Sequence, residues 1–281
     1  MRLISILVFV KLGLERGPGT DHNRRMSLSY IDHLEEQLRT APPKQKGLRT
    51  RQRLKIATAK ILARDGYHAM RVSDISARAR LAEGSFYVYF KDKADAALTV
   101  LSELLEEFLD LGNRAHHGER SQYEAIRDGN RRWIAVCRAN AGLMRCILQL
   151  GDEDPRLAEL AQRGNAMWYE RVAQSSARRR GARGASDASR FVVYMLGSMM
   201  DELVRKLIVY PDPHFHALLK QIGATDDETV ADAASVIFLH VLNPGASIPV
   251  GLPKPAAELA NWLLMPGERP TAVKSVKRAR A

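Results

Sequence analysis

Residues 78–93 read RARLAEGSFYVYFKDK and contain the most informative pattern of this 281-residue chain. Leu81, Phe86 and Phe90 are apolar at spacings that place them on one side of a short helix from about Glu83 to Phe90. The rest of the segment is mainly polar and basic, and the side chains on the open side are those of Glu83, Gly84, Ser85, Tyr87, Val88, Tyr89, Lys91 and Lys93. Such a face can read base edges in a DNA major groove while its flanks hold phosphates.

Two further short helices precede this one. The first has an apolar stripe at helical spacing that ends at Asp65-Gly66, and its members are Leu54, Ala57, Thr58, Ile61 and Leu62. The second runs from about Val72 to Ala79, with Ile75 and Ala79 turned inward. Three short helices within about 45 residues, the last two joined by a tight turn, predict a helix-turn-helix unit.

The positive charge of the chain is concentrated in the same region. The chain has 43 basic and 32 acidic side chains and a formal net charge of +11. From Lys44 to Lys93 there are 13 basic residues against four acidic ones, so this segment carries most of the excess. A local concentration of this kind indicates a nucleic-acid partner.

The remainder of the chain is predicted to be helical throughout, with no internal repeat. The expected helices are Ala94–Leu111, Ser121–Asn140, Gly142–Leu150, one from Pro155 to about Ala177, one ending at Tyr210, one ending at Leu242, and Pro255–Met265 with Trp262 inward. The fold class is therefore all-α, and we expect four regions. These are an amino-terminal extension (1–43), the helix-turn-helix domain (44–93), a larger helical domain (94–243), and a tail (244–281) with a short helix and a basic end at Lys274, Lys277, Arg278 and Arg280.

The first residues differ in character from the remainder of the chain. Leu3–Leu14 is apolar like a signal peptide, but Lys11 interrupts it and no small-residue cleavage site comes after it, so we prefer Met26 as the start and expect the extension to be disordered or mis-annotated in part. No apolar run reaches the roughly 18 to 20 residues of a membrane span, which predicts a cytoplasmic protein without a membrane partner. The two cysteines, Cys137 and Cys146, fit neither a disulfide framework nor a metal pair.

The stretch from Arg51 to Lys93 resembles the DNA-binding domain of TetR-family transcriptional regulators. The resemblance is carried by the first-helix stripe, Gly66-Tyr67, Asp74-Ile75 and the FYVYFKDK segment from Phe86 to Lys93. It implies that Glu83, Gly84, Ser85, Val88 and Tyr89 face bases or the adjacent backbone, and that Tyr87 and Lys93 hold phosphates. It further implies a backbone or base contact for Ser73 and a basic arm that contains Lys46, Arg49 and Arg51.

Three positions depart from the pattern of the family. Arg71 and Ala82 stand where the family has the Ser or Thr that caps a helix, and a lost cap costs roughly 1 kcal/mol. Ser73 or Ser85 is a possible substitute one turn later. Arg80 replaces the glycine of the turn, so either a left-handed residue is strained there or the turn has another shape. Arg80 is also a possible additional phosphate contact.

The resemblance also implies a homodimer, whose two recognition helices lie about one DNA turn apart. The last two long helices are expected to form the interface through Phe191, Tyr194, Met195, Gly197, Ser198, Met199 and Leu203 on one, and Val236, Ile237, Leu239, His240 and Val241 on the other. The alternative is that these residues belong to the core of one chain.

A cavity for a small-molecule effector is implied within the large domain. Adaptable methionines and large aromatics suit an irregular apolar ligand, and the candidates are Trp133, Cys137, Met144, Leu148, Met167, Trp168, Met195 and Met199. Arg145 or Glu170 is a candidate to orient a polar end of the ligand. Plain core packing is the alternative for each of them.

These features predict a sequence-specific regulator, foremost a repressor, that binds a pseudo-palindromic operator as a homodimer and is released by a small, largely apolar effector. A non-specific architectural DNA-binding protein without an effector remains open as an alternative, and so does an all-helical enzyme. The enzyme is disfavoured because HExxH, GxxxxGK and GxSxG motifs are missing from the sequence. No cofactor or metal is expected, since His116-His117 and His214-x-His216 fall in predicted loops.

Overall fold

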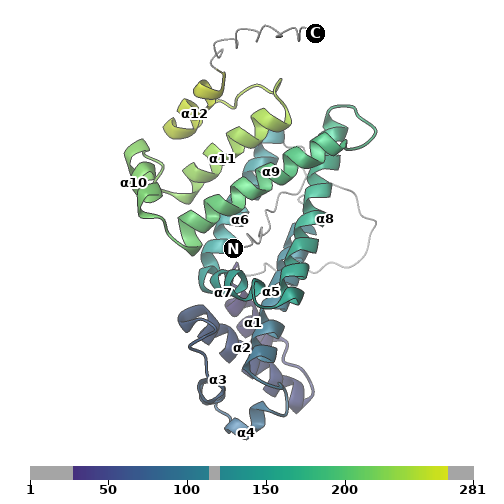
Figure 1. Cartoon of the computed structure of the whole chain (residues 1–281), viewed down its shortest axis with the longest axis vertical. Coiled ribbons are helices and arrows are strands. Elements are labelled where there is room, and N and C mark those ends of the chain that lie inside the picture. The colour runs from purple at the N-terminus through teal and green to yellow at the C-terminus, as the bar shows by residue number, and fades with distance from the viewer. Residues whose placement is uncertain (1–27, 114–120, 265–281) are drawn as a thin grey trace, which may run out of the picture.

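The computed structural model describes residues 28–113 and 121–264, and within these ranges the chain is helical without a strand. The all-α prediction is confirmed. Figure 1 shows an elongated molecule with α1 (Tyr30–Thr40), α2 (Lys46–Asp65), α3 (Val72–Ala79) and α4 (Glu83–Phe86) grouped at one end and α4 at the tip. The larger part contains α5 (Lys93–Asn113), α6 (Gln122–Ala139), α7 (Ala141–Gly151), α8 (Pro155–Arg179), α9 (Asp187–Val204), the π-helical η1 (Arg205–Val209), α10 (Pro213–Ile222), α11 (Asp227–Leu242) and α12 (Lys254–Leu264).

Several predicted features lie outside the described residues. They are the apolar segment Leu3–Leu14, the candidate start Met26, the pair His116-His117 and the basic end with Lys274, Lys277, Arg278 and Arg280. Within the described ranges, no helix combines the length and the apolar character needed to span a bilayer.

The small domain forms around the apolar stripe of α2. Leu54, Ile61 and Leu62 are buried together with Ile75 of α3 and Phe86 of α4. Gly66, with φ at +81°, ends α2 and accepts the sharp change of chain direction that a side chain would oppose. The core therefore positions α3 and α4 relative to α2.

Helix α1 belongs to the region that the sequence assigned to an amino-terminal extension, and it packs across α2. The Tyr30 hydroxyl donates to Glu103 Oε2 of α5 at 3.1 Å, and Lys55 Nζ of α2 lies 2.5 Å from the same oxygen. The backbone N–H of Tyr30 donates to Asn140 Oδ1, between α6 and α7, at 2.9 Å. The first turn of α1 thus ties α2 to two elements of the large domain.

The end of α2 and the start of α7 approach each other through their backbones. A Cβ atom placed on Gly142 would lie 2.0 Å from the carbonyl oxygen of Ala63, so only glycine fits there. One turn later, Cys146 Sγ donates to the Leu62 carbonyl oxygen at 3.4 Å. Of the described glycines, Gly142 makes the closest approach to another segment, and this approach joins α7 to α2.

In the large domain, α6 and α11 are joined by a series of polar contacts. The Tyr123 hydroxyl donates to Asp232 Oδ1 at 2.8 Å, Arg127 pairs with the same carboxylate, and Asn130 Nδ2 donates to Ser235 Oγ at 3.0 Å. Burial and the hydrogen bond to Asp232 raise the pKa of Tyr123. Buried hydrogen bonds of this kind hold two helices in one register.

Helix α12 covers part of α11, but it does so with a different face from the predicted one. Ala256 and Ala260 are buried against the domain, whereas Trp262 is 68% exposed. The prediction that Trp262 points inward is wrong. Two alanines one turn apart let the helices approach closely, and this places the tryptophan on the opposite side.

Helix α10 was not predicted, since the preceding helix was expected to end at Tyr210 and His214-x-His216 to fall in a loop; the loop prediction is wrong, because both histidines lie in α10. Asp212 caps the new helix by accepting from the N–H groups of His214 and Phe215 at 2.9 and 3.2 Å. Pro213 occupies the first turn and Gly223, with φ at +77°, ends it. An Asp-Pro pair is a regular start signal for a helix and was sufficient to find α10.

Candidate DNA-binding surface

The predicted recognition segment consists of one helical turn followed by a hydrogen-bonded turn. Helix α4 ends at Phe86, earlier than the expected Phe90, and the Phe86 carbonyl accepts from the N–H groups of Tyr89 and Phe90 at 2.9 and 3.1 Å. Phe86 and Phe90 are nevertheless both buried, with ring centroids 5.6 Å apart. They anchor the segment while its other side chains stay at the surface.

The departures at the helix starts have the expected structural effect. Neither Arg71 before α3 nor Ala82 before α4 provides a side-chain cap. Arg80 is left-handed, with φ at 56° and ψ at 51°, and is the one non-glycine residue with positive φ among those described. Of the two alternatives given for Arg80, a strained left-handed residue or a turn of another shape, the structure shows the left-handed residue.

The two tyrosines of the segment have different environments. Tyr87 is 56% exposed, and its hydroxyl has no hydrogen-bond partner within residues 28–113 and 121–264. Val88 is 75% exposed beside it. Tyr89 is half-buried, because its ring lies against the start of α2, where a Cβ on Gly47 would be 3.7 Å from the Tyr89 hydroxyl. Only Tyr87 is therefore fully available to an outside partner.

The other residues assigned to base or backbone contacts are also at the surface. Ser73, Glu83, Gly84 and Lys91 are exposed, and Ser85 is half-buried. Glu83 and Gly84 form the start of α4, at the tip of the molecule (Figure 1). The predicted set thus gathers on one end of the small domain.

The residues assigned to a basic arm lie in a helix. Lys46 is the first residue of α2, and Arg49 donates to the carbonyl oxygens of Pro43 and Lys44 at 2.9 and 2.7 Å. The guanidinium of Arg51 lies over the Phe90 ring, 5.3 Å from its centroid. The prediction of a basic arm is therefore corrected: Lys46, Arg49 and Arg51 belong to the first turns of α2. The sequence showed the basic run, but it did not show that the helix begins as early as Lys46.

Lys93 has an intramolecular role that the sequence did not show. Its ammonium group donates to the Met70 carbonyl oxygen at 3.1 Å and lies 4.9 Å from the centroid of the Tyr67 ring. It therefore closes the loop between α2 and α3. No sequence signal marks this contact, since the two segments are more than 20 residues apart.

The charges of the small domain are divided between paired and unpaired groups. Toward the large domain, Lys55 pairs with Glu103 of α5 and Lys60 with Glu35 of α1. Around α4, no carboxylate of the described residues pairs with Lys46, Arg71 or Lys91. Unpaired cations at the tip attract a polyanion, and the arrangement suits the phosphates on either side of a groove.

The residues proposed for an effector cavity fall into three groups. Trp133, Cys137, Met144 and Trp168 are buried in the large domain, and Leu148 and Met199 are half-buried. Met167 and Met195 are about half exposed on α8 and α9, so their assignment to an interior cavity is not supported within one chain. Helical spacing placed these two methionines among the interior candidates, but spacing alone does not show which side of a helix is covered.

The buried interior contains polar groups as well. Within the described residues, the Tyr169 hydroxyl and Trp168 Nε1 are buried without a hydrogen-bond partner. Burial raises the pKa of the Cys137 thiol, and the Asp201 carboxylate raises it further. Arg145 is directed elsewhere and donates to the Val209 carbonyl oxygen, while Glu170 pairs with Arg190 at 2.7 Å.

The predicted dimer residues are also divided. On α9, Phe191, Tyr194 and Ser198 are exposed, whereas Gly197 is buried under the Tyr169 ring. On α11, Val236 and Leu239 are buried, since α6 and α12 cover that helix, and Val241 is exposed. Leu203, Ile237 and His240 are half-buried. The exposed apolar side chains among the predicted interface residues therefore lie mainly on α9, whereas most of those on α11 are covered.

Comparison with known proteins agrees with this geometry. The family model described as bacterial regulatory proteins, tetR family, matches residues 56–98, from the middle of α2 into α5. Over 54 residues the chain is 35% identical to the fatty acid metabolism regulator protein of Bacillus subtilis. That segment covers 19% of this chain and 28% of the relative, so the chain spans less than a third of the curated protein it matches.

Two solved structures have a similar fold. GusR of Salmonella enterica has a TM-score of 0.53 at 16% identity, covering 71% of this chain and 98% of its own. The transcriptional regulator FadR from Bacillus subtilis, solved in complex with stearoyl-CoA, has a TM-score of 0.51 at 17% identity, covering 68% and 97%. The matched family and the two Bacillus subtilis relatives are regulators and not enzymes. The resemblance inferred from FYVYFKDK is confirmed for residues 56–98, which match the model of the tetR family of bacterial regulatory proteins.

Proposed function

We propose that this regulator binds a pseudo-palindromic operator as a homodimer and represses transcription until a small, largely apolar effector releases it. The observation that carries the proposal is the exposed face of α4 and the following turn, held on buried Phe86 and Phe90 and surrounded by unpaired cations. In this proposal Glu83, Ser85 and Val88 contact base edges, and Tyr87 holds a phosphate. Two such faces, about 34–36 Å apart in a dimer, would read successive major grooves.

The homodimer is supported by the apolar face of α9. Phe191 is 66% exposed, Tyr194 and Met195 are exposed one turn later on α9, and Met167 is exposed on the neighbouring α8. An exposed group of large apolar side chains on one helix pair is typical of a protein interface. We expect the wild type to sediment as a dimer and Phe191→Glu as a monomer with weak operator binding. A wild-type monomer at micromolar concentration would contradict the interface.

The experiment that tests operator recognition is selection of duplexes from a random pool, followed by competition binding. A specific regulator should enrich an inverted repeat and prefer it over random DNA by roughly a thousandfold or more. Ser85→Ala should change the preferred base at one position of each half-site. Arg64→Ala is the control, since Arg64 lies in the same domain, is exposed and pairs with Asp65 at 2.6 Å.

The alternative, a non-specific architectural protein, predicts the opposite result in the selection experiment. It shares the basic surface, but no sequence would be enriched and Ser85→Ala would change nothing. Equal affinity for selected and random duplexes would therefore favour it and refute operator recognition.

For the effector, we propose a long-chain acyl thioester. The support is the likeness to the Bacillus subtilis regulator solved with stearoyl-CoA and the apolar interior around Trp133 and Met144, which holds the unpartnered polar groups of Trp168 and Tyr169. Stearoyl-CoA should lower operator affinity by about 5- to 150-fold, the usual range of coupling between sites. Coenzyme A alone is the control. Unchanged affinity with stearoyl-CoA would refute this class of effector.

A further inference from the structure

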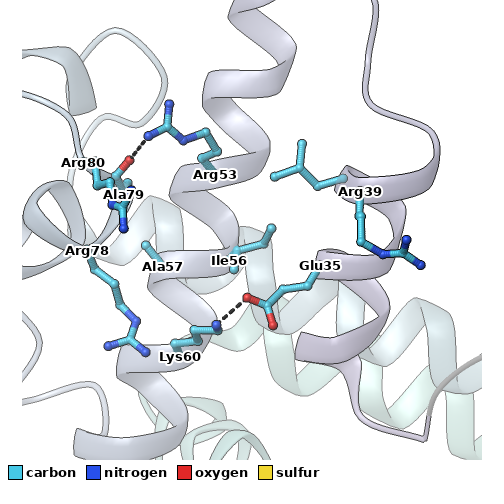
Figure 2. Close-up of a pocket in the computed structure, with 10 residues that line it drawn as sticks. Glu35, Arg39, Arg53, Ile56, Ala57, Lys60, Arg78, Ala79 and Arg80 are labelled. Atoms are coloured by element: carbon cyan, nitrogen blue, oxygen red, sulfur yellow. Dashed lines mark hydrogen bonds and ion pairs between the residues drawn. The ribbon is translucent and has the colours of Figure 1, made fainter.

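A groove of about 550 Å³ lies beside the helix-turn-helix unit, between α1, α2 and the end of α3. Figure 2 shows the side chains that line it, and five of them are cationic: Arg39, Arg53, Lys60, Arg78 and Arg80. Its volume falls within the range of small-molecule sites. None of its lining residues belongs to α4 or to the segment from Tyr87 to Lys93.

Most of the positive charge in this groove lacks a carboxylate partner. Lys60 pairs with Glu35, the one acidic residue that lines the groove, and Arg39 pairs with Glu36 at 2.7 Å. Arg53 donates to the carbonyl oxygen of Ala79, which carries no charge. The structure shows no ion pair for the guanidinium groups of Arg78 and Arg80 within the described residues. Like charges gathered in a concave site attract an anion.

The space between the cations is apolar. Ile56, Ala57 and Ala79 are buried and form the floor, and half-buried Leu38 of α1 lies beside them. Such a floor can pack the organic part of a ligand, while the guanidinium groups of Arg53, Arg78 and Arg80 hold its oxygens; Figure 2 shows Arg39 turned away from these three. Guanidinium groups bind phosphate through two parallel hydrogen bonds, a geometry that a lysine does not offer.

We propose that this groove binds a small organic phosphate of the nucleoside polyphosphate class. More than one arginine is available from different helices, which suits a ligand with several phosphate groups. One wall is α1, whose first turn is held by Glu103 and Asn140 of the large domain, and α1 lies before the residues that the family model matches. The groove shares no residue with α4, with the Tyr87–Lys93 segment or with the candidate effector cavity, while Arg80 is common to the groove and to the candidate DNA phosphate contacts.

The test is isothermal titration of the full chain with ATP and with inorganic tripolyphosphate, without metal and at fixed ionic strength. We expect one saturable site per chain, with tighter binding of ATP because the apolar floor contacts its organic part. Arg78→Ala and Arg80→Gly should each weaken ATP binding by about tenfold or more, the usual effect of losing a charge-assisted hydrogen bond. Arg64→Ala, on α2 but outside the groove, should leave it unchanged.

Thermal unfolding of each variant shows whether it is folded. Glycine tolerates the left-handed conformation of Arg80, so Arg80→Gly decides the result should Arg78→Ala fail to fold. Absence of saturable binding of ATP would overturn the proposal. So would an equal loss of affinity in Arg64→Ala, which would indicate binding to general surface charge, or tripolyphosphate binding as tightly as ATP.

A parallel titration with duplex DNA distinguishes a free ligand from the DNA backbone. Arg78→Ala should keep its DNA affinity within about twofold. If Arg78→Ala lost DNA affinity as strongly as ATP affinity, the groove would hold a DNA phosphate and the proposal would be wrong. Because the ATP titration contains no DNA, its failure leaves the proposed operator function unaffected.

Discussion

Replacement of Tyr87 by phenylalanine removes a single hydroxyl group from the proposed phosphate contact. The side chain is 56% exposed and the hydroxyl has no partner within the described residues, so the variant should fold with unchanged stability. A surface hydrogen bond to phosphate is worth about 1 to 1.5 kcal/mol after competition with water. A dimer loses two of them, and about 2 to 3 kcal/mol corresponds to a roughly 30- to 150-fold weaker affinity.

Fluorescence anisotropy with labelled duplexes measures this loss. The factor should be the same for operator and random DNA, because phosphates carry no sequence information. The dependence of affinity on salt should not change, since tyrosine is uncharged and releases no counterion. Tyr210→Phe is the control, because Tyr210 is also partly exposed but packs beside Arg145 in the large domain. An affinity within twofold of the wild type for Tyr87→Phe would refute the phosphate contact.

Three further predictions concern stability and reactivity. Arg80→Gly should raise the free energy of unfolding by up to about 1 kcal/mol in urea titrations, because glycine tolerates the left-handed turn; a less stable variant would contradict strain at this position. Gly197→Ala should lower it by about 1 to 3 kcal/mol, because the new Cβ would lie 2.2 Å from the Tyr169 ring, and an unchanged melting curve would show that α9 shifts freely. Cys137 and Cys146 should resist iodoacetamide at pH 8 until urea unfolds the chain, because burial raises the pKa of both thiols, and mass spectrometry would detect early alkylation if this is wrong.

The small domain could be predicted from the sequence because its pattern is local. The spacing of Phe86 and Phe90, and the stripe that contains Leu54 and Ile61, already define which side of each helix is buried. The charge of the surface follows from composition. The sequence also showed that Arg80 occupies the turn, and the structure then distinguished between the two conformations that this allowed.

What could not be predicted depends on contacts between distant segments. The carbonyl partners of Lys93 lie in the loop that ends at Met70, and nothing near Lys93 in the sequence indicates them. Met195 and Trp262 were assigned to the interior because apolar residues at helical spacing are usually buried, but spacing alone does not show which neighbour covers a face. On α12 the two alanines, and not the tryptophan, turned out to be in contact with α11.

The main-chain contact between Gly142 and Ala63 has a consequence for how movement passes through the molecule. Side chains can change rotamer and absorb a small displacement, whereas a peptide group pressed against another peptide group cannot. A displacement of α7 by a fraction of an ångström would therefore push directly on the last turn of α2. Because this main-chain contact cannot be compressed, the orientation of the small domain depends directly on the packing of α7.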